Sequence, residues 1–297
     1  MTQILEINGL TKRFGEKTAL RNVSLSLAKG KVLGLIGENG AGKTTIIKHI
    51  LGSYIPQEGS VRVFGLDPVK DPAGVLGNVG YLAEEDGLPG WMRVYELQRY
   101  FQGFYQNWDQ AYAEDLREKF KIDRKAIIKQ LSKGQRARVG LMAALAYRPE
   151  LLLLDEPSSG LDPIVRREIL TSIVRAVANE NRTVLFSSHL LSEIELVADQ
   201  VAMIREGEIL FCDTLDNVKQ SNRRITLRFN AVRTSAPEIG EALNWEGYGQ
   251  EWTCLYSGNT ATLEASVSLL DAKVVEESWL TLDEIFHARS APKVEHA

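Results

Sequence analysis

One octapeptide limits what this chain can fold into more than any other part of the sequence. Residues 37–44 read Gly-Glu-Asn-Gly-Ala-Gly-Lys-Thr and fit the pattern GxxxxGK followed by Ser or Thr completely. The apolar segment Lys31–Ile36 before it is typical of a strand, and Lys43–Leu51 after it is typical of a helix. Glycines between a strand and a helix let successive backbone N–H groups turn inward around a phosphate chain. With pattern and context both matching, the octapeptide predicts a nucleotide-binding loop rather than a structural turn.

A second segment supplies carboxylates at the end of a strand. Leu151–Asp155 is a continuous apolar run that ends in Asp155 and Glu156, and such runs are typical of buried parallel strands. On its own this ending is a weak signal. Beside a phosphate loop it gains weight, because α/β sheets bind ligands at the carboxyl ends of their strands. We then expect Lys43 to reach the β- and γ-phosphates, Asp155 to hold Mg²⁺ through its water shell, and Glu156 to act as the general base.

The segment Leu131–Gln135 has two interpretations. It reads Leu-Ser-Lys-Gly-Gln at the start of a helical run. Ser132 and Gly134 at a helix N-terminus would form a second anion site. Ser132 and Gln135 would equally form a capping box, in which each side chain bonds the other residue's backbone N–H. The residues alone leave this choice open.

The order of short strands and helices predicts an α/β fold with a mostly parallel sheet. The segment Thr183–Ser187 reads as another buried strand, and Pro163–Asn179 as a helix entered through Asp162. Residues 88–150 contain helical spacing instead of β-branched runs, which indicates a helical insertion between strands. The expected helices of this insertion are Met92–Gln106, Asp109–Lys121 and Gly134–Tyr147.

The last quarter of the chain differs in composition. Residues 1–220 hold 28 Lys and Arg against 28 Asp and Glu, whereas residues 221–297 hold 7 against 11 and three of the five Trp. We therefore predict a domain boundary near residue 220 and a small α+β domain after it. Its expected elements are strands Ile225–Phe229 and Lys273–Glu276 and a terminal helix Thr281–Phe286.

Composition also excludes several classes of protein. The net charge of −4 and the pI near 5.7 argue against a nucleic-acid-binding protein. No stretch approaches the roughly 18 to 20 apolar residues of a membrane span, and the N-terminus lacks the pattern of a signal peptide. The two cysteines, Cys212 and Cys254, match no metal or redox spacing, which fits a reducing cytosol.

Taken in order, the motifs resemble the nucleotide-binding subunit of ATP-binding cassette (ABC) transporters over residues 4–220. The octapeptide matches the Walker A loop, Leu131–Gln135 the signature motif, and Leu151–Glu156 the Walker B strand. Ser159–Asp162 matches the D-loop and His189 the switch histidine. The resemblance implies a P-loop ATPase fold with an antiparallel N-terminal β part.

The resemblance also implies roles for individual residues. His189 would contact the γ-phosphate and orient the water together with Glu156 and Lys43 as the catalytic set. Two subunits would pack head to tail, so that the signature motif of one acts on the ATP of the other. The implied nucleotide-binding residues are Phe14, which would stack on adenine, and Gly37, Asn39, Gly40, Ala41, Gly42, Lys43, Thr44, Thr45, Ser132, Gly134 and Gln135. The implied Mg²⁺ ligands are Thr44, Glu84 and Asp155.

Two positions depart from the family pattern. Lys133 replaces the first Gly of the usual LSGGQ signature; its side chain would point to solvent or add positive charge near the phosphate of the partner subunit. Glu84 stands where the family has the Q-loop glutamine. A carboxylate there can still ligate Mg²⁺ directly or through water.

These observations lead to one functional hypothesis and one alternative. The chain is expected to be an ATPase that binds ATP and Mg²⁺, forms a homodimer or heterodimer, and drives a separately encoded transmembrane permease, with export favoured by resemblance of the tail to drug and bacteriocin exporter subunits. It would lie at the cytoplasmic face of the bacterial inner membrane. The alternative is a non-transport ABC ATPase that acts on a soluble macromolecular assembly.

Overall fold

The chain folds into two compact units, residues 1–212 and 213–297. The computed structural model describes residues 2–84 and 87–290. The sequence analysis placed the division near residue 220. In the structure it lies between Cys212 and Asp213, two residues before the strand Glu208–Thr214 ends, and the helix Leu215–Ser221 that follows this strand belongs to the second unit.

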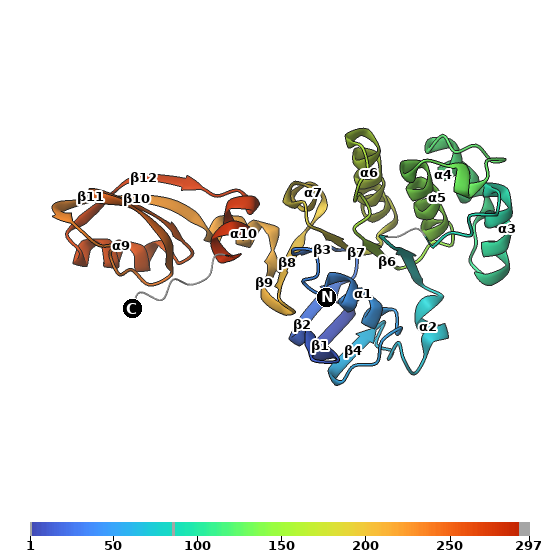
Figure 1. Ribbon diagram of the computed structural model, residues 1–297, viewed down its shortest axis with the longest axis horizontal. Coiled ribbons are helices and arrows are strands. Elements are labelled where there is room, and N and C mark those ends of the chain that lie inside the picture. Colours follow the sequence, from blue (N-terminus) through green and yellow to red (C-terminus); the bar gives the residue numbers. More distant parts are fainter. Residues whose placement is uncertain (1, 85–86, 291–297) are drawn as a thin grey trace. The chain divides into compact units, whose positions relative to one another are not determined.

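A six-stranded sheet forms the centre of the first unit (Figure 1). Its strands, in spatial order, are β5 (Val79–Leu82), β6 (Leu151–Asp155), β7 (Thr183–Ser188), β3 (Val32–Ile36), β8 (Gln200–Arg205) and β9 (Glu208–Thr214). The pairs β5–β6, β6–β7, β7–β3 and β3–β8 are all parallel. The mostly parallel sheet predicted from the sequence is therefore confirmed.

The central strands are apolar along their whole length because both faces of the sheet are covered. Every residue of β3, β6 and β7 is buried. Figure 1 shows α6 (Pro163–Glu180) and α7 (Leu191–Val197) on one side of the sheet and α1 (Lys43–Ile50) on the other. The covering of two faces explains why these strands show no polar alternation in the sequence.

A second, antiparallel sheet follows the order β2-β1-β4. Its strands are β1 (Gln3–Phe14), β2 (Lys17–Ala28) and β4 (Glu58–Val63). Side chains of this sheet, α1 and β3 share one hydrophobic core, with Leu5, Ile7, Leu33, Ile46 and Ile47 at 0–1% exposure. The antiparallel N-terminal part that the family resemblance implied is confirmed.

The insertion between β5 and β6 is helical, as predicted. It contains α3 (Val94–Phe104), α4 (Gln110–Lys119), a 3-10 turn (Ile128–Gln130) and α5 (Lys133–Leu145), and the short α2 (Pro72–Leu76) precedes β5. Asp109 fixes the start of α4: its carboxylate accepts bonds from Tyr112 N and Arg148 Nε, each at 2.9 Å. These two bonds hold the pKa of Asp109 below its usual value.

The second unit is a small α+β fold. Its elements are α8 (Leu215–Ser221), β10 (Arg223–Arg233), β11 (Ala242–Tyr256), α9 (Thr260–Leu269), β12 (Ala272–Trp279) and α10 (Leu282–Ser290), with the sheet in the order β11-β10-β12. The sequence predicted β10, β12 and α10, whereas α8, β11 and α9 were not predicted. Cys254 is a buried core residue here, and its burial raises the pKa of the thiol to about 12. Cys212 and Cys254 are both free thiols.

The helices that the structure describes are too short or too polar to span a membrane. Among the residues that the structure describes, no helix is long and apolar enough to cross a membrane.

Packing of α7 on β3 leads to a stability prediction. A Cβ added at Gly34 would lie 2.6 Å from Cγ2 of Ile194, so Gly34→Ala forces α7 away from the sheet and should destabilise the first unit by about 1–3 kcal/mol. Gly103→Ala is the matched control: it adds the same methyl group in α3, where nothing lies within 4 Å, and should stabilise by roughly 0.5–1 kcal/mol. Urea unfolding measures both, and equal effects would contradict the packing argument.

Candidate functional site

Residues 37–44 form a tight loop between β3 and α1. Gly42 has a φ of 118°, in the region that only glycine adopts readily. A Cβ at Gly37 would lie 2.4 Å from the carbonyl oxygen of Ile204, and one at Gly42 would lie 2.9 Å from that of Ala19. The glycines are thus required by close backbone packing. No side chain caps the start of α1, which leaves its first N–H groups available to an anion.

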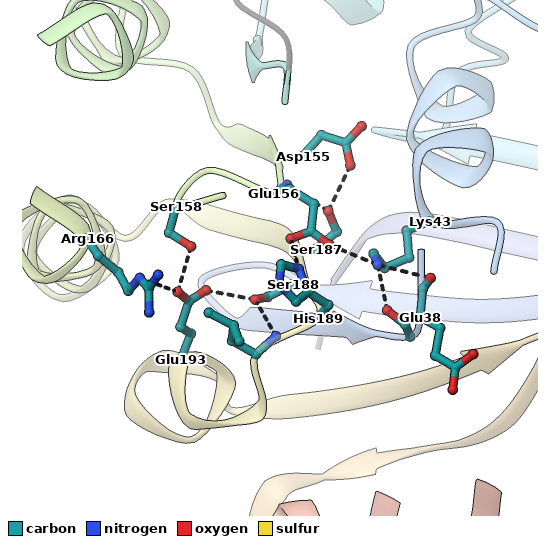
Figure 2. Close-up of polar contacts among 12 residues, drawn as sticks. Glu38, Lys43, Asp155, Glu156, Ser158, Arg166, Ser187, Ser188, His189 and Glu193 are labelled. Carbon is teal, nitrogen blue, oxygen red and sulfur yellow. Dashed lines mark hydrogen bonds and ion pairs between the residues drawn. The ribbon is translucent and has the colours of Figure 1, made fainter. Parts of the chain in front are cut away.

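Lys43, the first residue of α1, lies buried beneath this loop. Its Nζ donates to the carbonyl oxygens of Gly37 at 2.6 Å and Glu38 at 3.3 Å. The same Nζ lies 2.8 Å from Oε1 of Glu156, and the two side chains are only 5% and 4% exposed (Figure 2). The cation that the sequence assigned to phosphate therefore forms a buried ion pair with the predicted general base.

Glu156 is held by the strand beside it. It follows β6 directly and has a φ of 48°, and its backbone N donates to Ser187 Oγ at 2.9 Å. Nδ1 of His189 lies 2.8 Å from Oε2 of Glu156. The sequence predicted that Glu156, His189 and Lys43 act together, and the structure brings their three side chains into contact.

Asp155 is the last residue of β6, directly before Glu156, and is 1% exposed. Its Oδ1 accepts a hydrogen bond from Ser187 Oγ at 2.8 Å. Burial of the Tyr81 side chain, together with the negative charge of Asp155, raises the pKa of Tyr81 to about 12. In the part of the chain that the structure describes, no Lys or Arg side chain forms an ion pair with it. Buried carboxylates are found paired with a cation or coordinating a metal, so the environment of Asp155 fits a Mg²⁺ ligand.

The described residues build no metal cage of their own. No group of three His, Cys, Asp or Glu side chains among them could hold an ion. Mg²⁺ commonly takes one or two protein ligands and completes its shell with water and substrate phosphates. The donor set Thr44, Asp155 and Glu84 fits that mode rather than a permanent metal centre.

A cavity of about 470 Å³ opens above the loop and gathers most of the predicted residues. Those that line it are Phe14, Asn39, Gly40, Gly42, Lys43, Thr44, Thr45, Glu84 and Glu156. Gly37 and Ala41 do not line it, because both are buried in the floor of the loop. Asp155 and His189 do not line the cavity; His189 contacts Glu156, which does.

An aromatic platform stands at the edge of this cavity. Phe14 is 45% exposed, and its ring meets the ring of Tyr54 edge-on at a centroid distance of 5.4 Å. Nζ of Lys12 lies 5.3 Å from the Phe14 centroid and 5.5 Å from that of Tyr54. One exposed ring, held by two neighbours, can stack on a flat base.

The signature residues lie outside this cavity in the same chain. Ser132 caps α5 and forms the expected box with Gln135: Ser132 N donates to Gln135 Oε1 at 2.9 Å, and Gln135 N donates to Ser132 Oγ at 3.2 Å. Both side chains are exposed. The capping interpretation is therefore correct locally. Of the first N–H groups of α5 the box uses that of Gln135, so it is compatible with an anion site at the N–H groups of Lys133 and Gly134.

Lys133 turns toward the segment that follows β6. A Cβ added at Gly160 would lie 2.7 Å from Nζ of Lys133. Gly160 has a φ of 66°. Lys133 also lines a second cavity of about 240 Å³, together with Glu84 and Glu156. The substituted signature position thus contacts the D-loop of its own chain.

Sequence reasoning missed several residues that complete the site. Ser187 bridges Asp155 and Glu156, and Tyr54 and Lys12 support Phe14. Ser187 had a usable signal, since a serine at the end of a buried strand two residues before His189 is unusual in an apolar run. Tyr54 and Lys12 had none, because only the fold brings them to Phe14.

Comparison with known proteins agrees with this geometry. The family model of ABC transporters matches residues 20–159. The ABC transporter ATP-binding protein NatA of Bacillus subtilis (strain 168) is 35% identical over 76% of this chain and 96% of its own length. The bacitracin transport ATP-binding protein BcrA of Enterococcus faecalis is 34% identical over 76% of this chain and 74% of its own.

A solved structure shares the fold. The structure of the ATP-binding subunit of an ABC transporter superposes with a TM-score of 0.67 at 27% identity, over 73% of this chain and 92% of that one. The same family is indicated by the complete Walker A loop, by the buried Walker B carboxylate pair and by these relatives. The chain belongs to the ATP-binding subunits of ABC transporters, and it is an ATPase of that family.

Proposed function

We propose that this chain hydrolyses ATP in a head-to-tail dimer and thereby drives a separate transmembrane permease in export. One observation carries the hydrolytic part of the proposal: Lys43, Glu156 and His189 meet at the edge of a cavity whose other walls are the phosphate loop and Phe14. A nucleotide bound with its base on Phe14 and its phosphates along the loop would end at this cluster.

Lys43 would change partners when ATP binds. Its Nζ lies 2.8 Å from Oε1 of Glu156 in this structure. The β- and γ-phosphates carry more negative charge than one carboxylate and would attract the ammonium group more strongly. Glu156 would then be released toward the water that attacks the γ-phosphate.

Glu156 and His189 would act on that water as a pair. The freed carboxylate of Glu156 accepts the proton of the water as general base. The imidazole of His189, already within hydrogen-bond distance of Glu156, orients the carboxylate and contacts the γ-phosphate. Positioning and charge stabilisation supply most of the catalysis in phosphoryl transfer.

Mg²⁺ would be held by Thr44, Asp155 and Glu84. When bound, the ion neutralises phosphate charge that develops during hydrolysis. Thr44 and Glu84 line the cavity, and Asp155 would supply buried negative charge. The Glu at the position of the usual Q-loop glutamine keeps an oxygen ligand there.

Dimerisation follows from where the signature motif lies. Ser132, Gly134 and Gln135 are at the N-terminus of α5 and do not line the cavity above the phosphate loop of their own chain. A second subunit, identical or different, would present these residues to the γ-phosphate. This arrangement supports a site completed only between two chains.

Export through a membrane partner is supported by the relatives. BcrA is named for bacitracin transport, and no described helix of this chain spans a membrane. A separate permease would therefore provide the pathway, and the subunit would lie peripherally at the cytoplasmic face of the bacterial inner membrane. The unit formed by residues 213–297 would support dimerisation or regulation.

Removal of the Lys43 charge should weaken ATP binding. Lys43→Ala is expected to raise the Kd for ATP roughly tenfold to hundredfold, because a hydrogen bond to a charged group contributes about 1.5–3 kcal/mol. Lys48→Ala removes the same charge from the last turn of the same helix and should leave the Kd unchanged. Calorimetric titration of both variants decides, and equal Kd values would remove Lys43 from the phosphate site.

Removal of the base should stop turnover without preventing binding. Glu156→Gln is expected to lower kcat by roughly 10²- to 10⁴-fold and to accumulate as an ATP-bound dimer in size-exclusion chromatography. Glu150→Gln, just before the other end of β6, alters a carboxylate that pairs with Lys29 at the surface and should keep full activity. Near-normal hydrolysis by Glu156→Gln would refute the role of Glu156.

The transport proposal has its own test. A gene beside this one that encodes about six apolar spans would be a candidate permease. After co-expression, the two proteins should co-purify in detergent, and added substrate should raise the ATPase rate. Co-purification with a soluble assembly instead would favour the non-transport alternative.

A further inference from the structure

Glu193 is a buried carboxylate that no motif of the sequence singled out. It lies on α7 and is 2% exposed. Ser158 Oγ donates to its Oε1 at 2.6 Å, and Ser188 Oγ donates to its Oε2 at 2.7 Å. Both serines are 1% exposed. Figure 2 shows the carboxylate between the two hydroxyl groups.

Arg166 on α6 compensates the charge of this carboxylate. Its Nε lies 3.3 Å from Oε1 of Glu193, and its Nη2 donates to the carbonyl oxygen of Leu161 at 3.4 Å. A carboxylate buried to this extent is tolerated only when it is paired and well hydrogen-bonded. Glu193 therefore connects α6 and α7 with two loops, and its bonds are well defined.

The two serines belong to the segments that carry the reacting side chains. Ser158 follows Glu156 by two residues, in a turn closed by Ser159 N to Glu156 O at 3.0 Å and Leu161 N to Ser158 O at 3.1 Å. It directly precedes the D-loop, Ser159–Asp162. The backbone of this turn cannot move without moving Glu156.

Ser188 directly precedes His189, and its Oγ also accepts a hydrogen bond from Leu190 N at 3.0 Å. The hydroxyl thus bonds the backbone on the far side of the histidine. His189 is held from both neighbours, while its Nδ1 lies 2.8 Å from Glu156. The position of the imidazole depends on where Glu193 keeps Ser188.

We propose that Glu193 is a positioning residue for ATP hydrolysis, which holds the turn after Glu156 and the strand end before His189 in one arrangement. Its two carboxylate oxygens each accept from one segment, so both segments are fixed by a single rigid group. A carboxylate can accept at both oxygens, whereas an amide of the same shape accepts at one. The inference rests on the roles proposed above for Glu156 and His189.

The main variant is Glu193→Gln in the full chain. We expect kcat to fall roughly tenfold to hundredfold, the range that follows from a misplacement of about 1 Å in reacting groups. The Kd for ATP should change little, because the phosphate loop and Lys43 have no bond to Glu193. Glu195→Gln makes the same chemical change on the same helix and should keep the wild-type kcat.

Hydrogen exchange separates positioning from general support of the fold. Glu193→Gln should speed exchange in residues 156–162 and 187–190 while β3 and β6 keep their protection. Ser188→Ala should lower kcat as well, and the double variant Ser188→Ala with Glu193→Gln should lose no more than the larger single effect, because both changes break one connection. Should Glu193→Gln fail to fold, Ser158→Ala and Ser188→Ala provide the same test.

The outcomes are separable from those of the proposed function. A wild-type kcat in Glu193→Gln, or a loss of kcat matched by an equal loss of ATP affinity and by faster exchange throughout the unit, overturns the positioning role. Full activity in Glu156→Gln instead overturns the assignment of the base. If Glu156→Gln is inactive and Glu193→Gln is fully active, only the positioning role of Glu193 is refuted.

Discussion

The whole site depends on the parallel pairing of β7 between β3 and β6. The register sets Ile36 beside Ser188 and Asp155 beside Ser187, so three strands end at one level. The phosphate loop, the carboxylate pair and the histidine leave the sheet from these three ends. A slip of one residue in β7 would move the side chain of Ser187 to the face where that of Ser188 now lies, and the reverse. The groups that now touch would be separated. The fold thus selects the chemistry through backbone hydrogen bonds that are themselves remote from any ligand.

Buried charge in the first unit is compensated in two different ways. Lys43 and Glu156 neutralise each other, with carbonyl oxygens and an imidazole completing their bonds. Glu193 is satisfied mainly by hydroxyl groups, with Arg166 further away. Ion pairs of low exposure contribute little to stability by themselves but cost much when one partner is lost. On the roles proposed above, the first arrangement would exchange one anion for another, whereas the second would keep its shape.

Sequence reasoning predicted those parts whose physics is local. Three local patterns each predicted one kind of element: the glycines at 37, 40 and 42, the apolar runs of β6 and β7, and the helix start at Asp162–Pro163. The structure has a loop, two strands and a helix at these places. Glu193 and Tyr54 carry no such local signal, because their partners lie far away in the chain. In the second unit β11 was missed since Gly247 and Gly249 interrupt its alternation, both with positive φ. The signature residues show what a single chain leaves open. Their helix cap is visible in this structure, but the surface of a second subunit that would contact them is not.

If Lys43 binds phosphate as proposed, its ion pair with Glu156 would also set a preference among anions. Any phosphate that takes Lys43 must first separate a pair whose two side chains are almost fully buried, and the observed affinity is reduced by the free energy of that separation. The reduction is the same for every ligand, so it weighs most on small ones. Inorganic phosphate has nothing else to gain, whereas a nucleotide can also reach the ring of Phe14 at the rim of the same cavity. On the proposed role of Lys43, separation of the ion pair would therefore leave free phosphate with a much lower net affinity than a whole nucleotide.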